Sequence, residues 1–156
     1  MSAGDLRFYH SDGSPADAAI ALTGPFVHVE IDLGDGTAIG ELLTGLQHYA
    51  LPSEPPGRVV AFPTSDHTGA APLANALAWA QAEAAQHLGY GWADVADAAL
   101  AFLDPGAPFV AQARAYDCSD FCTRFLLHAG VPLPAAIASE PHTVTPSALA
   151  AALGVK

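Results

Sequence analysis

The sequence predicts an α+β fold in which an antiparallel β-sheet comes first along the chain and helices follow. Two patterns indicate this fold. Apolar and polar residues alternate in segments up to residue 62, and apolar residues recur at helical spacing from residue 72 onward. The chain has 156 residues, a length that fits one domain, and it contains no internal repeat. A single domain, 1–156, is therefore expected.

The first part of the chain reads as short strands joined by turns. The predicted strands are 4–10, 26–33, 37–43, 46–50 and 58–62. The strand over 26–33 has the clearest pattern, because its two faces differ in chemistry. One face carries Val27, Val29, Ile31 and Leu33, and the other carries His28, Glu30 and Asp32. Gly34-Asp35-Gly36 predicts a hairpin turn to the next strand, whereas residues 16–24 are expected to be irregular.

The second part of the chain changes to helical spacing. Pro72 suits the first turn of a helix, which is expected to continue to Leu88 before Gly89 ends it. The other predicted helices are 92–103, a helix that begins at Cys118, and 147–153, which Thr145-Pro146 caps. Residues 105–115 and 133–143 are expected to be irregular, and the first of these segments leads directly into the cysteine helix.

Composition argues against several classes of partner. Apolar residues make up 51% of the chain and charged residues 13%, a balance that is unlike that of disordered proteins. The formal net charge of -11 argues against binding to nucleic acid or to an anionic membrane surface, since both attract cationic proteins. The most apolar window, residues 70–85, contains Asn75, Gln81 and Glu83. It predicts a buried helix and no membrane span.

The cysteines and the N-terminal residues bear on the compartment. Cys118 and Cys122 lie one helical turn apart, where a disulfide would be strained, so both thiols are expected to be reduced. The first residues include charged side chains and no apolar run, so no signal peptide is expected. Both features favour a cytoplasmic protein, with export by a route that reads no Sec signal as the open alternative.

The stretch from Tyr116 to Cys122 predicts the start of a helix with a thiol on its first turn. Asp117 is a good N-cap residue, and Asp120 suits the positive end of the helix dipole. Backbone N–H groups at this end favour a thiolate, which makes Cys118 a candidate nucleophile. The alternative is that Cys118 is a small core residue. Cys122 lies one turn deeper, among apolar residues, and is expected to be core.

A nucleophilic thiolate needs a base, and seven histidines compete for that role. His28 shares its strand face with Glu30 and Asp32, whereas its immediate neighbours in the chain are valines on the other face. The remaining histidines lie in polar loops, at helix ends, or at the undecided position 48. His28 is therefore the preferred base.

Several short motifs also occur in a fixed order over most of the chain. They are Gly4-Asp5-Leu6, Val27-His28-Val29, Gly34-Asp35-Gly36, Leu77-Ala78-Trp79-Ala80 with Gly89-Tyr90, Asp117-Cys118-Ser119, and Thr145-Pro146 with Leu149. The set resembles the circularly permuted papain-fold hydrolases, which include permuted NlpC-like amidases, YiiX-like proteins and the lecithin retinol acyltransferase type. In that group the histidine strand precedes the cysteine helix.

The resemblance implies a permuted papain-like fold, with an antiparallel sheet packed against the cysteine-bearing helix and additional helices. It also implies Cys118 as nucleophile and His28 as general base and acid. The group usually has a third polar residue where this sequence has Gly40. A two-residue turn would place Glu41 opposite Glu30, on the His28 face, whereas a three-residue turn would place Gly40 there. Glu41 is the preferred orienting residue, with Glu30, a backbone carbonyl or water as alternatives.

The expected activity is therefore cleavage of an amide bond, in a peptide or a peptidoglycan-derived molecule, through a thioester acyl-enzyme. Glu30, Asp32 and Tyr116 are expected to bind a small peptide, amide or acyl substrate, although Glu30 and Asp32 are also consistent with an ordinary solvated strand face. No cofactor is expected. A metal site is disfavoured because only two thiols are present and both point to the core.

Two other functions remain open. A thioester-forming acyltransferase or lipid hydrolase would need an apolar channel, for which Trp92, Phe102 and Phe109 are candidates. A non-catalytic binding module of the same fold is favoured by the missing polar residue at Gly40. The sequence does not indicate an oligomeric state.

Overall fold

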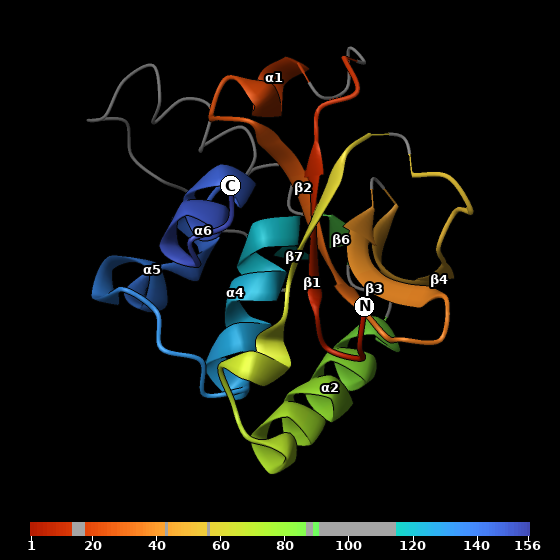
Figure 1. Ribbon diagram of the computed structural model, residues 1–156, viewed down its shortest axis with the longest axis vertical. Coiled ribbons are helices and arrows are strands. Elements are labelled where there is room, and N and C mark those ends of the chain that lie inside the picture. The colour runs from red at the N-terminus through yellow and green to blue at the C-terminus, as the bar shows by residue number, and fades with distance from the viewer. Residues whose placement is uncertain (14–17, 43, 56, 87–88, 91–114) are drawn as a thin grey trace.

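The computed structural model describes residues 1–13, 18–42, 44–55, 57–86, 89–90 and 115–156. Its centre is a five-stranded antiparallel sheet with the strand order β4-β3-β2-β1-β5 (Figure 1). The strands are β1 (Leu6–His10), β2 (Phe26–Asp32), β3 (Thr37–Leu42), β4 (Gly45–Ala50) and β5 (Val59–Phe62). The predicted α+β class, the antiparallel sheet and all five predicted strands are confirmed, with ends that differ by one or two residues.

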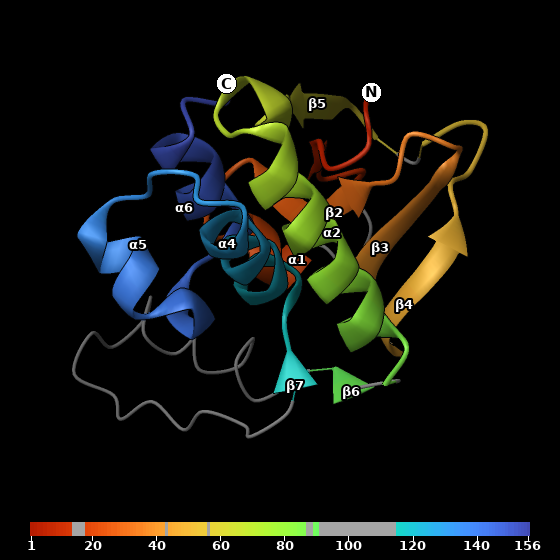
Figure 2. The same cartoon turned by 90° about the horizontal axis from the view of Figure 1, so that it is seen from below.

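Helices pack against this sheet. The longer ones are α2 (Ala70–Ala84) and α4 (Cys118–His128), which lie side by side in Figure 2 and contact each other. The shorter elements are α1 (Ala18–Ala21), η1 (Thr64–Asp66), α5 (Ala135–Ser139), η2 (Pro141–Thr143) and α6 (Pro146–Ala152). Two short parallel strands, β6 (Gly89–Tyr90) and β7 (Ala115–Tyr116), form a separate pair just before α4.

The core between the sheet and α4 fixes the position of the cysteine helix. Phe121 and Phe125 of α4 are fully buried in the same cluster as Phe8 of β1 and Ile31 of β2. Burying side chains of this size stabilises a fold by about 1.5–3 kcal/mol each. Trp79 of α2 stacks on Phe121 with 5.4 Å between ring centroids. These contacts fix the position of α4, and with it the N-terminus of the helix, against the sheet and α2.

A β-bulge changes which side chains of β2 share a face. Tyr9 pairs with His28, but His10 pairs with Phe26, so Val27 is the extra residue in β2. Phe26 belongs to the core cluster, whereas Val27 lines a pocket together with His28. The prediction that Val27 shares the aliphatic face of Val29 and Ile31 is therefore wrong, because simple alternation is broken at the bulge.

The hairpin between β2 and β3 has a three-residue turn, Gly34 to Gly36, closed by the hydrogen bond from the Leu33 N–H to the Thr37 carbonyl. Ile31 pairs with Ile39 and Asp32 with Ala38. This register aligns Gly40 with Glu30 and puts Glu41 on the same face as Ile39 and Ile31. The preferred prediction, that Glu41 lies opposite Glu30 on the His28 face, is wrong, and the three-residue alternative is correct.

The helix predictions differ from the structure in extent. The first long helix begins at Ala70 and ends at Ala84, earlier than predicted, and Gly89 begins a short strand. Parts of 16–24 and 133–143, which were expected to be irregular, form α1, α5 and η2. The run of alanines in α5 favours a helix over an irregular segment. The predicted helix 92–103 lies outside the described residues, as does the predicted loop 105–115 except for Ala115.

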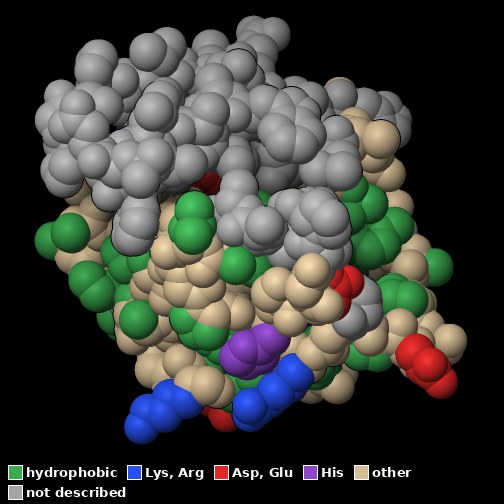
Figure 3. Space-filling model, turned by 90° about the horizontal axis from the view of Figure 1, so that it is seen from above, with side chains coloured by type: hydrophobic (Ala, Val, Ile, Leu, Met, Phe, Trp, Pro, Cys, Tyr) green, Lys and Arg blue, Asp and Glu red, His purple; other side chains and the backbone are tan. Residues whose placement is uncertain are grey.

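The acidic side chains of the described residues do not form one patch on the face seen in Figure 3. Hydrophobic and uncharged atoms make up most of the described part of that face, and acidic side chains are scattered over it. In the described part of the chain, every helix is too short or too polar to cross a membrane.

Candidate active site

The N-terminus of α4 presents Cys118 on a well-formed helix cap. The Asp117 carboxylate accepts hydrogen bonds from the N–H groups of Ser119 (2.8 Å) and Asp120 (2.7 Å), as predicted for an N-cap. Burial raises the pKa of Asp117 to about 7, despite these hydrogen bonds. The cap therefore uses the N–H groups of Ser119 and Asp120 and not that of Cys118 itself.

The C-terminus of α4 lies where the sequence predicts it, just before Gly130. Gly130 has a φ of 71°, a left-handed conformation that glycine adopts without strain. The N–H of Val131 bonds to the Leu126 carbonyl and that of Gly130 to the Leu127 carbonyl, which is a Schellman motif.

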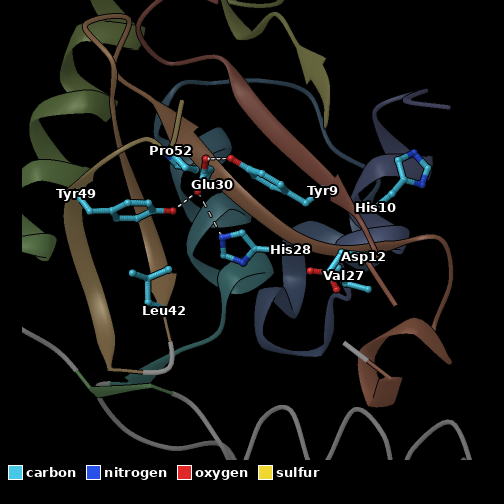
Figure 4. A pocket seen from close by; sticks show the side chains of 9 residues that line it. All are labelled: Tyr9, His10, Asp12, Val27, His28, Glu30, Leu42, Tyr49 and Pro52. Atoms are coloured by element: carbon cyan, nitrogen blue, oxygen red, sulfur yellow. Dashed lines mark hydrogen bonds and ion pairs between the residues drawn. The ribbon is translucent and has the colours of Figure 1, made fainter. Parts of the chain in front are cut away.

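His28 lies between Cys118 and Glu30. Its Nε2 atom is 3.5 Å from Oε2 of Glu30, an ion pair drawn in Figure 4. Burial alone would lower the pKa of His28, but its interactions with Cys118 and Glu30 outweigh burial and raise that pKa to about 10. In the described residues, β2 and β3 pair only at Ile31–Ile39 and Asp32–Ala38. The imidazole therefore lies beyond the paired part of the two strands, within reach of α4.

Glu30 is a buried carboxylate with four partners. It accepts hydrogen bonds from the hydroxyls of Tyr9 and Tyr49 and forms an ion pair with His28 (Figure 4). It also forms an ion pair with Nε of Arg7 at 3.2 Å. Burial would raise the pKa of Glu30, but His28 and the tyrosine hydroxyls hold that pKa below its usual value. Glu30 is only 1% exposed, so the expectation of a solvated strand face is wrong for this residue.

The sequence did not single out Tyr9 and Tyr49 as part of this cluster. Burial and the negative charge of Glu30 raise the pKa of both phenols, so both hydroxyls stay protonated and donate to the carboxylate. A signal for Tyr9 was present, because alternation along β1 puts Arg7 and Tyr9 on one face. Pairing of β1 with β2 places that face beside Glu30, and this pairing was not predicted.

Glu41, the predicted orienting residue, has a different environment. Its carboxyl group is buried on the α4 side of β3, and neither of its oxygens has a hydrogen-bond partner in the described residues. Burial, followed by the nearby charge of Asp117, raises the pKa of Glu41 to about 9. The structure therefore brings Glu30, and not Glu41, against the imidazole of His28.

The remaining predicted site residues have separate positions. Asp32 forms an ion pair with Arg7 at 2.9 Å and accepts the Gly34 N–H at 2.7 Å, so its oxygens support the sheet and the hairpin turn. Tyr116 lies in β7, two positions before Cys118. The aromatic residues proposed for an apolar channel, Trp92, Phe102 and Phe109, lie outside the described residues.

A pocket of about 270 Å³ opens beside His28 and Glu30. Its lining residues, shown in Figure 4, are Tyr9, His10, Asp12, Val27, His28, Glu30, Leu42, Tyr49 and Pro52. Cys118 is 4% exposed and is not part of this lining. The pocket has room for a group about the size of one amino-acid side chain.

No protein-family model matches the chain, and no curated protein is significantly similar to it. The function is therefore inferred from the geometry of the site.

The two thiols should differ in reactivity. Iodoacetamide at pH 7 should alkylate Cys118 in the native protein, because its sulfur lies at a helix N-terminus beside the His28 imidazolium. Cys122 should stay unmodified, because burial raises its pKa well above the usual value. Peptide mapping by mass spectrometry after timed labelling measures both rates. Equal labelling of the two cysteines before unfolding would contradict this assignment.

Proposed function

We propose that this chain is a cysteine hydrolase that cleaves an amide bond in a peptide or a peptidoglycan-derived molecule. The observation that carries the proposal is the position of His28, which interacts with the Cys118 sulfur on one side and with the buried Glu30 carboxylate on the other. A nucleophile, a base and a group that orients the base are the three parts of a thiol hydrolase.

The roles follow from the contacts. Nε2 of His28 faces Glu30, which leaves Nδ1 for the sulfur. The thiolate attacks the carbonyl carbon, and the Cys118 N–H donates to the oxyanion that forms. The imidazolium then gives its proton to the leaving amine as the C–N bond breaks, which leaves a thioester on Cys118. His28 next takes a proton from water, the hydroxide attacks the thioester, and the acid leaves as the sulfur regains its starting state.

Glu30 takes the orienting role in this proposal. Its charge stabilises the imidazolium, and its own position is fixed by Tyr9, Tyr49 and Arg7. The glycine at position 40 fits this arrangement, because a Cβ there would lie 3.0 Å from Cβ of Glu30 and 3.1 Å from the Tyr49 hydroxyl. Glu30 takes the role that a polar side chain at position 40 would have. The glycine at position 40 is therefore weaker support for a non-catalytic binding module.

We also propose a permuted papain-like fold for this chain. A histidine on β2 that precedes the cysteine on α4, with the sheet packed against that helix, agrees with a permuted papain-like arrangement. Small amide substrates would place their leaving group beside the His28 imidazole, where the pocket lies.

Intact-mass spectrometry tests the proposed function. The protein is incubated with acyl-peptide probes that carry an activated ester and, in parallel, with acyl-lipid probes of the same reactivity. We expect one acyl group per chain from the peptide probes, attached to Cys118 and absent from a Cys118→Ala variant. Failure of every probe to acylate the wild-type protein, or an adduct that persists in Cys118→Ala, would contradict the proposal.

The second candidate is a thioester-forming acyltransferase or lipid hydrolase. The apolar side chains of Val27, Leu42 and Pro52 in the pocket wall favour it. Faster acylation by the lipid probes, or release of the acyl group to an added amine in preference to water, would support this function over amide hydrolysis.

The tyrosines that hold Glu30 should matter for stability. Tyr49→Phe removes one hydrogen bond to a buried carboxylate, which should lower the free energy of unfolding by about 1.5–3 kcal/mol. Tyr9→Phe should have a similar effect. Because both hydroxyls bind the same carboxylate, the double variant should differ from the sum of the single variants by at least about 0.5 kcal/mol. Denaturant titration measures all three, and strict additivity would contradict the shared role.

A further inference from the structure

Glu41 is a buried acid that the proposed mechanism does not use. Its side chain is 2% exposed, and both carboxyl oxygens lack a hydrogen-bond partner in the described residues. A buried polar group without a partner is costly and rare, so its presence needs a reason. Glu41 is also among the largest fully buried side chains of the described protein, in a position that a leucine or methionine would fill without that cost.

The surroundings of Glu41 place it at the junction of β2, β3 and α4. It pairs with the core residue Leu46 of β4 and so faces α4. The charged groups that act on it are Asp117 and Asp120 from the first turn of α4 and His28 from β2. Cys118 directly follows Asp117 and interacts with His28, so Glu41 faces the region in which the reacting sulfur lies.

The protonation state of Glu41 follows from these neighbours. Two aspartates oppose a negative charge on Glu41 and only His28 favours one, while burial disfavours charge altogether. The resulting pKa of about 9 keeps the group neutral at pH 7. A neutral carboxylic acid has an O–H that can donate, and a buried carboxylic acid held neutral is a known means of donating a hydrogen bond to an oxyanion.

We propose that Glu41 is a catalytic hydrogen-bond donor, which together with the Cys118 N–H stabilises the oxyanion formed when the Cys118 thiolate attacks a carbonyl. This role rests on the proposed function. It explains why the Glu41 oxygens have no partner among the described residues, because their acceptor exists only during the reaction. It also assigns different tasks to the two buried glutamates, since Glu30 must be charged to hold His28 and Glu41 must be neutral to donate.

Two reagents separate this role from that of the Cys118–His28 pair. Iodoacetamide alkylates the thiolate by displacement of iodide and forms no oxyanion. p-Nitrophenyl acetate acylates the same sulfur through a tetrahedral oxyanion. The C–O bond then breaks, p-nitrophenolate leaves, and an acetyl thioester stays on Cys118. A group that acts only on the oxyanion affects the second reaction and not the first.

Glu41→Met keeps the size of the side chain and removes the donor, whereas Glu41→Gln keeps a neutral donor. We expect Glu41→Met to lower the acylation rate by about 100- to 1,000-fold, the usual effect of losing one oxyanion donor. Its alkylation rate should stay within about threefold of the wild-type rate. Glu41→Gln should acylate within about tenfold of wild type, since the amide still donates. Thermal unfolding of both variants serves as the control for folding.

The pH profile gives a readout that a structural role would not move. As the pH rises through about 9, Glu41 ionises, loses its proton and opposes the oxyanion. The wild-type acylation rate should therefore fall relative to that of Glu41→Gln between pH 8 and 10. Taking the ratio of the two rates removes the titration of His28, which both proteins share.

The results that would overturn the role are distinct from those that would overturn the function. Wild-type acylation that Glu41→Met leaves unchanged would exclude a donor at position 41. A loss in Glu41→Gln as large as in Glu41→Met would mean that the negative charge is needed, which also contradicts the proposal. Parallel loss of alkylation in Glu41→Met would make Glu41 a support of the nucleophile. A wild-type protein that neither reagent modifies would contradict the proposed function and this role with it.

Discussion

Replacing His28 with alanine should lower the rate of Cys118 acylation by p-nitrophenyl acetate at pH 7 by about 100- to 10,000-fold, the usual contribution of a positioned acid–base group. His28 interacts with Cys118, and the Glu30 carboxylate stabilises the imidazolium from the other side. His48→Ala is the matched control, because His48 is exposed on β4 and bonds only to the Thr37 hydroxyl in the described residues.

The pH dependence of alkylation distinguishes loss of the pair from general damage. A histidine whose pKa is raised to about 10 stays charged below that value, so the rate advantage of the wild-type protein over His28→Ala should persist from pH 6 to 9. As the pH rises through about 10, His28 loses its proton, and its charge no longer acts on Cys118. The His28→Ala rate should instead rise steadily with pH, as in an ordinary thiol. Identical profiles for the two proteins would mean that His28 does not act on the sulfur.

Glu30→Gln should be the most destabilising single change at the site. It removes the charge that Arg7 and His28 pair with, and an amide cannot accept from both tyrosine hydroxyls while its NH₂ group occupies one position. Breaking a buried ion pair from one side costs about 3–5 kcal/mol. For a chain of this size the melting temperature should fall by roughly 10 °C.

Glu41→Gln provides the matched control for Glu30→Gln, since both positions are buried and lie on neighbouring strands. Glu41 has a folded-state pKa above its unfolded value, so the folded protein loses stability as the pH rises from about 4.5 toward about 9. Glu41→Gln should therefore melt higher than wild type at pH 8, by a margin that shrinks toward pH 5. Equal destabilisation by the two substitutions would contradict the separate roles of the two glutamates.

Local patterns in the sequence were sufficient for the five strands of the sheet and for the start of the cysteine helix, but not for α1, α5 and η2. The Asp117 cap, the start of α4 at Cys118 and the polar residues of β2 depend on neighbours within one turn or one strand, and each is present in the structure. The resemblance to a family added the order of the two motifs. Cys122 was predicted as core for the same local reason, and it is fully buried.

The orienting group could not be predicted because it depends on register. Whether Glu30 or Glu41 faces His28 is decided by the length of the turn, and one residue more or less moves every side chain of β3 to the opposite face. The bulge at Val27 had the same effect on β2. Tyr49 reaches Glu30 from β4, two strands away, and no pattern within a single strand reports such a contact.

The titration of His28 itself tests the central claim most directly. Nitrogen-15 NMR of the imidazole in the wild-type protein should show that His28 stays protonated until the pH approaches about 10. In Cys118→Ala the sulfur is absent, and the pKa of His28 should fall, because burial lowers it and Glu30 alone opposes that effect. A wild-type His28 that titrates near pH 6.5, with the same midpoint in Cys118→Ala, would contradict a functional Cys118–His28 pair.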